Sequence, residues 1–126
     1  MYIAVIEEEP LIRDMLRHAL ELGGHRVDIY GTMPEQFRLY DLLIVEPGEF
    51  GQGFPAISQL MRGYCIPILI LTFYEGNVCM AREYNLPAIH KMPFRLTHLL
   101  RTIGRFSQFK ARLPQPQPHQ SPLEAC

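Results

Sequence analysis

The sequence lacks the long apolar run, the strong net charge and the leader segment that mark several common classes of protein. No run of apolar residues approaches the roughly 20 that a membrane-spanning helix needs, and the first residues lack the basic, apolar and small-residue parts of a signal peptide. The formal net charge of -1 at pH 7 gives no general basic field for nucleic acid. We therefore expect a cytoplasmic protein without membrane contact and without direct nucleic-acid binding.

Cysteines and recognisable catalytic motifs are also scarce. Cys65, Cys79 and Cys126 are odd in number and widely spaced, which fits neither a disulfide framework nor a zinc site. We expect three reduced thiols. A nucleophile–base pair, a glycine-rich phosphate loop and metal-ligand spacing are all missing. These absences argue against an independent enzyme.

What the sequence does contain is enough for one folded domain. It has 126 residues, of which 48% are apolar, and a chain of this size buries a single core. Residues 113–122 alternate proline with polar residues, a pattern typical of an extended, solvated linker. We predict a domain over residues 1–110 and a Pro/Gln-rich linker or tail over residues 111–126.

Short apolar runs alternate with helical patterns along this domain. The runs predict strands, and the spacing of apolar residues between them predicts helices. The expected strands are residues 2–6, 25–30, 41–45, 67–71 and 88–91, and the expected helices are 11–22, 35–39, 54–62, 75–84 and 95–109. Strands and helices that alternate in this way predict an α/β fold, a doubly wound parallel sheet flanked by helices on both faces.

Four segments, in order, resemble the receiver domains of two-component response regulators. Residues 3–13 (IAVIEEEPLIR) resemble the first strand and acidic turn of that family, and residues 40–46 (YDLLIVE) resemble the strand before the phospho-acceptor. Residues 66–72 (IPILILT) resemble the strand that ends at a hydroxyl, and residues 81–94 resemble the region up to a Lys-Pro-Phe turn. The resemblance implies a flavodoxin-like, CheY-like sheet with strand order 2-1-3-4-5.

The resemblance also assigns roles at the carboxyl edge of the sheet. In the family, acidic residues hold Mg²⁺, an aspartate accepts the phosphoryl group, and a lysine and a hydroxyl bind that group. Here the acidic pocket maps to Glu7 and Glu8, the hydroxyl to Thr72, and the acceptor position to Glu46. The extra methylene of Glu46 displaces its carboxylate by about 1.3 Å, and about 1 Å of misplacement can cost a large factor in rate.

Two further family positions are substituted. An alignment without a gap places Met92 at the lysine position, and only a one-residue insertion would restore that role to Lys91. The position of the family's aromatic switch residue is Ile89. The resemblance therefore implies a degenerate receiver that does not need a cofactor, with weak Mg²⁺ binding as the one possible exception.

Simpler interpretations stay open for each residue. Glu7, Glu8 and Glu9 suit a solvated helix start, Glu46 suits a surface loop, and Thr72 suits a strand end or cap. If the carboxylates do converge, they are expected to recruit a cation or shift a pKa. Alternatively, Glu46 reaches toward Thr72 and imitates a phosphorylated acceptor.

We expect a pseudo-receiver that binds a protein partner or a second copy of itself without phosphorylation. The expected surface spans the helix at 75–84, the strand at 88–91 and the last helix. Its polar contacts are Arg82, Tyr84, His90, Lys91, His98, Arg101 and Arg105, although such a cluster is also typical of a solvated face. Two alternatives are a phosphorylatable, Mg²⁺-dependent receiver and the N-terminal regulatory domain of a DNA-binding effector.

Overall fold

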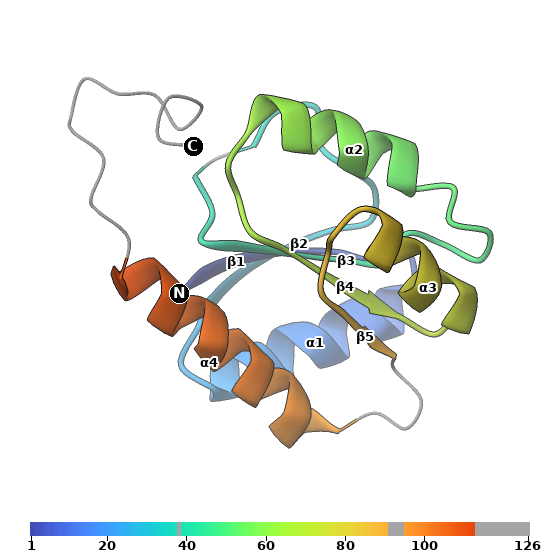
Figure 1. Ribbon diagram of the computed structural model, residues 1–126. Coiled ribbons are helices and arrows are strands. Elements are labelled where there is room, and N and C mark those ends of the chain that lie inside the picture. The colour runs from blue at the N-terminus through green and yellow to red at the C-terminus, as the bar shows by residue number, and fades with distance from the viewer. Residues whose placement is uncertain (38, 91–94, 113–126) are drawn as a thin grey trace.

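The computed structural model describes residues 1–37, 39–90 and 95–112. Its strands are β1 (Tyr2–Ile6), β2 (Arg26–Tyr30), β3 (Leu42–Val45), β4 (Ile68–Thr72) and β5 (Ala88–His90). Its helices are α1 (Pro10–Leu22), α2 (Phe54–Gly63), α3 (Glu75–Glu83) and α4 (Leu96–Arg112). In Figure 1, α1 and α4 cover one face of the central sheet, and α2 and α3 cover the other.

The sheet has the predicted strand order. All five strands are parallel, in the order β2-β1-β3-β4-β5. Ile6 at the end of β1 lies beside Tyr30 of β2 and beside Val45 of β3. The carboxyl ends of these three strands therefore meet at one edge. This arrangement confirms the doubly wound α/β fold.

The sheet is buried on both faces, which explains its nearly continuous apolar strands. Alternate side chains of β1 point to opposite faces: Ile3 and Val5 pack with α1 and α4, whereas Ala4 and Ile6 pack with α2 and α3. Each residue of β3 is at most 2% exposed. Such a sheet forms a rigid base for the loops at its carboxyl edge.

The helix predicted over residues 35–39 is absent. Residues 35–37 and 39 are irregular, and residue 38 lies outside the described part of the chain. Five residues supply too few hydrogen bonds to offset the cost of starting a helix. Instead Phe37 packs edge-on against Tyr40, with ring centroids 6.4 Å apart. Tertiary packing of aromatic rings therefore replaces local helical structure here.

Three tyrosines and one aspartate fill the space beside this connection. Tyr2 and Tyr40 both donate hydroxyl hydrogen bonds to Asp28, the second of them at 2.7 Å, and the Tyr30 and Tyr40 hydroxyls are 2.5 Å apart. Burial raises the pKa of Tyr40, and its hydrogen bonds with Tyr30 and Asp28 raise it further. This cluster closes the β2 side of the core that α2 and α3 cover.

The structure corrects one expectation about the cysteines. Cys79 is exposed and free, as predicted, but Cys65 is disulfide-bonded, so the expected reduced thiol is wrong at that position. Cys126 lies outside the described residues. Across the described residues, none of the helices combines the length and the apolar character needed to cross a membrane.

Candidate functional site

The predicted acidic residues lie together at the carboxyl edge of the sheet. Glu7 follows β1 and Glu46 follows β3, and their backbone N–H groups continue the sheet by donating to Tyr30 and Ile6, both at 3.0 Å. The loops around them line a cavity of about 760 Å³ that is open to solvent. Five carboxylates line it: Glu7, Glu8, Glu9, Glu46 and Glu49.

Glu46 connects two neighbouring strand ends. Its Oε1 atom accepts a hydrogen bond from the backbone N–H of Phe73 at 3.2 Å, and its side chain is partly buried. Phe73 directly follows the last residue of β4. The side chain at the predicted acceptor position therefore ties the end of β3 to the loop after β4.

The three glutamates after β1 have different environments. Glu7 is 5% exposed, and its Oε1 accepts from the backbone N–H of Glu9 at 3.2 Å. Glu8 is exposed. Glu9 caps α1 by accepting from the N–H of Leu11 at 3.4 Å, and Pro10 occupies the first helical position. The helix-start interpretation thus describes Glu9, whereas Glu7 is a buried residue of the cavity.

Thr72 is fully buried at the end of β4. Its Oγ1 accepts from the N–H of Tyr74 and from the side-chain amide of Asn77, each at 3.1 Å. Phe73 and Tyr74 line the acidic cavity but Thr72 does not. Its expected role toward a phosphoryl group stays a prediction, and its observed bonds are those of a residue that organises a loop and a helix start.

Asn77 was missed by the sequence-based interpretation. It is 2% exposed and lies on the buried side of α3 together with Ala81. Besides Thr72, its amide donates to the backbone oxygen of Gly48 at 2.6 Å. The sequence signal was weak: Asn77 stands four residues before Ala81, so the two share one face of the helix.

The carboxylates of the described residues are not grouped as a metal site. Among the described residues, no three His, Cys, Asp or Glu side chains are grouped so that they could hold a metal ion. Mg²⁺ requires oxygen ligands in near-octahedral geometry, and Glu7 and Glu46 each accept a backbone N–H instead. The expectation of weak Mg²⁺ binding stays a prediction.

The pKa of Tyr74 is raised by desolvation and by the negative charges around the cavity. Desolvation raises the pKa of its hydroxyl, and nearby carboxylates raise it further. In order of their effect these are Glu49, Glu46, Glu7 and Glu8. A negative charge on the phenol is disfavoured next to other negative charges. Four acidic side chains from two loops, those after β1 and β3, thus act on one point at the cavity wall.

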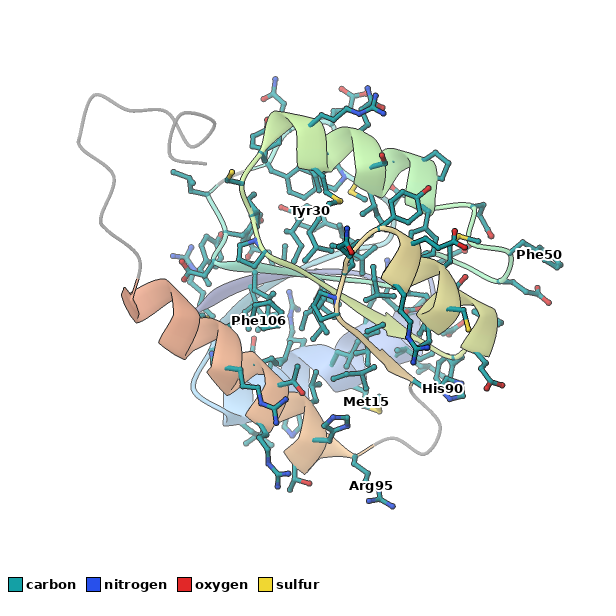
Figure 2. All side chains as sticks on the ribbon, in the orientation of Figure 1. Met15, Tyr30, Phe50, His90, Arg95 and Phe106 are labelled. Atoms are coloured by element: carbon teal, nitrogen blue, oxygen red, sulfur yellow. The ribbon has the colours of Figure 1, made fainter. Side chains whose placement is uncertain are left out.

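The remaining predicted positions fall partly outside the described residues. Met92 and Lys91, the two candidates for the lysine position, both lie there. Ile89, at the switch position, is 9% exposed and packs into the core that α1 and α4 cover. His90, labelled in Figure 2, lies with Nε2 2.8 Å from the backbone oxygen of Phe73. It therefore supports the loop that Glu46 also contacts.

The predicted partner surface is only partly available. Arg82, His98, Arg101 and Arg105 are exposed. Tyr84 instead stacks on Phe54, with ring centroids 5.2 Å apart and planes 14° apart. The helices α3 and α4 lie on opposite faces of the sheet and flank its edge strand β5. Exposed cations therefore occur on both sides of this edge.

Comparisons with known proteins identify the fold. A scan against models of protein families and a search of curated proteins find no match. Solved structures do match. A response regulator receiver protein from Pseudoalteromonas atlantica is 15% identical, with a TM-score of 0.74 over 87% of this chain and 99% of that one.

Two further structures agree. The non-phosphorylated HemR receiver domain from Leptospira biflexa is 23% identical, with a TM-score of 0.71 over 92% of this chain and 98% of that one. The response regulator TrrA from Thermotoga maritima, solved with Mg²⁺-BeF, is 23% identical, with a TM-score of 0.67 over 83% and 97% of the two chains. The chain therefore has the fold of CheY-like receiver domains.

Proposed function

We propose that the protein is a pseudo-receiver, a phosphorylation-independent signalling module that acts by binding another protein in a two-component-type system. One observation carries this proposal. Glu46, at the position where the family places its phospho-acceptor, already accepts the N–H of Phe73 at 3.2 Å. Its carboxylate thus joins the loops after β3 and β4 without a phosphoryl group.

The surroundings of Glu46 support the same proposal. The hydroxyl of Thr72 is taken up by two donors, Tyr74 and Asn77, and does not line the cavity. The described carboxylates are not grouped for a metal ion. We infer a cytoplasmic protein that is not an enzyme, needs no cofactor and does not bind nucleic acid through this domain.

The test is exposure to Mg²⁺ and a small phosphodonor, read by intact mass. We expect no stable gain of a phosphoryl group by the wild-type chain. Glu46→Gln, which cannot accept a phosphoryl group, is the matched control, and Glu46→Asp restores the shorter carboxylate. A gain in the wild type that Glu46→Gln abolishes would support the alternative of a working, Mg²⁺-dependent receiver and overturn the proposal.

The partner surface we propose consists of α3, β5 and α4. Its exposed described cations are Arg82, His98, Arg101 and Arg105. If this surface joins two copies, light scattering should give twice the chain mass, and Arg82→Glu with Arg101→Glu should return the monomer. Arg62→Glu, an exposed arginine at the end of α2, is the control for charge reversal elsewhere. A dimer unaffected by the double variant would exclude this surface.

A second candidate is the N-terminal regulatory domain of a DNA-binding effector protein. The proline and glutamine alternation of residues 113–122, typical of an interdomain linker, favours it. The coding sequence downstream of Cys126 is the direct check. An effector domain there would change the output of the module and leave the proposed role of Glu46 unchanged.

A further inference from the structure

The side chain of Asn77 joins two loops that frame the acidic cavity. Its Nδ2 atom lies 2.6 Å from the backbone oxygen of Gly48, in the loop after β3, and 3.1 Å from Oγ1 of Thr72, at the end of β4. A primary amide nitrogen has two hydrogens to donate. One buried group therefore serves both loops, and both bonds are shielded from water because Asn77 is 2% exposed.

The loop after β3 is itself closely hydrogen-bonded. Gly51 donates to Gly48 at 3.0 Å, and Gly53 donates to the backbone oxygen of Pro47 at 2.7 Å. Gly48 has a φ of 96°, which glycine adopts without strain. Asn77 thus holds a loop that has one defined shape, and its bond to Gly48 fixes that shape relative to α3.

The exposed tip of this loop is Phe50, which is 83% exposed and projects from the molecule in Figure 2. The N–H of Phe50 donates to Oε1 of Gln52 at 2.9 Å. The position of this ring therefore depends on the loop that Asn77 holds. The side chain of Asn77 is therefore the link between Thr72 and the loop that carries Phe50.

We propose that Asn77 is a positioning residue that couples Thr72 to the loop of residues 47–53. It keeps the Thr72 hydroxyl turned toward α3 and away from the acidic cavity, and it fixes the loop that carries Phe50. The hydroxyl and the loop then change position together. This coupling stands on the hydrogen bonds alone, while its regulatory meaning, a domain held in one state, rests on the proposed pseudo-receiver function.

Amide hydrogen exchange measured by NMR on the whole chain tests the coupling. Asn77→Ala should speed exchange at Tyr74, Gly51 and Gly53 together, by about tenfold or more, because two buried acceptors lose their donor. Asn77→Leu has nearly the same shape without any polar atom and should act alike if the alanine variant does not fold. Cys79→Ser, at an exposed position two residues along α3, should leave these rates unchanged.

Thr72→Val provides the decisive comparison. It removes the hydroxyl and keeps the shape of the side chain, so exchange at Tyr74 must rise in any case. Coupling predicts that exchange at Gly51 and Gly53 rises several-fold as well, although neither touches Thr72. Exchange that rises at Tyr74 alone would overturn the proposal, as would unchanged rates at Gly51 and Gly53 in both Asn77 variants.

A second measurement separates this proposal from the pseudo-receiver function. Beryllofluoride with Mg²⁺ is added to the wild type, and the amide signals of Phe73 and Tyr74 are followed. Unchanged signals support the pseudo-receiver proposal. Shifted signals would overturn that function, and the coupling would still be decided by the exchange rates.

Discussion

Glu46 and Phe73 are joined by a hydrogen bond of 3.2 Å between a carboxylate oxygen and a backbone N–H. The two residues directly follow β3 and β4, which are neighbours in the sheet. Glu46, at the position predicted for the phospho-acceptor, thus links the loops that follow these two strands.

This link should contribute measurably to stability. Glu46→Ala removes the acceptor and should lower the free energy of unfolding by about 1.5–3 kcal/mol, the range for hydrogen bonds to charged groups. Glu46→Gln keeps an acceptor oxygen and should lose less than half as much. Urea unfolding gives both values. Equal losses in the two variants would show that the bond to Phe73 is not what Glu46 contributes.

Alkaline pH should weaken the fold through Tyr40. Its pKa is raised in the folded state, chiefly by burial, so the unfolded chain loses this proton first as pH rises. The stability contributed by the protonated phenol is therefore complete below about pH 10 and decreases above it. Above about pH 10, the midpoint of thermal unfolding should therefore fall more steeply with pH for the wild type than for Tyr40→Phe. Parallel profiles would contradict this role.

Two glycines should respond to alanine in opposite directions. A Cβ at Gly53 would lie 2.8 Å from the backbone oxygen of Pro47, and backbone cannot move aside as a flexible side chain can. Gly53→Ala should destabilise the fold by about 1–3 kcal/mol. Gly104, inside α4, has no atom within 4 Å of such a Cβ. Gly104→Ala should stabilise by about 0.5–1 kcal/mol, and thermal unfolding of both variants tests the pair.

Removal of the tail should leave the domain folded. A chain that ends at Arg112 keeps all of α4, including the buried side chains of Leu99 and Ile103. The composition of residues 113–122 predicts a solvated segment that adds no core. When both chains are kept reduced, so that the disulfide of Cys65 contributes to neither, the midpoint of thermal unfolding should therefore change by no more than about 2 °C, which corresponds to under 1 kcal/mol. A larger decrease would contradict the predicted boundary near residue 110.

The sheet could be predicted because its strands are marked by local sequence. Residues 42–45 and 68–72 are apolar runs, and Pro10 after three acidic residues marks the start of α1. The helix over 35–39 was wrongly predicted, because Phe37 packs on aromatic neighbours and Leu39 is exposed. Such contacts join residues far apart in the chain, as Phe37 and Tyr64 are, so a short stretch of sequence cannot predict them.

The candidate site was predictable only in outline. Parallel strands bring their carboxyl ends to one edge, so the meeting of Glu7 and Glu46 follows from strand order. The partners of Thr72 and Asn77 do not follow from it. The carbonyl of Gly48 is a backbone group, which leaves no mark in the sequence, and its direction depends on a positive φ.

The irregular connection between β2 and β3 has a consequence for engineering. Residues 31–41 lead from β2 to β3, on the other side of β1, and their described residues form no helix. The aromatic cluster at Asp28 and Tyr40 already completes the core on this side. Loop length costs little entropy when extended. A helix, an epitope or a fluorescent domain inserted near Glu35 and Gln36, both exposed, would therefore leave the packing of that core unchanged.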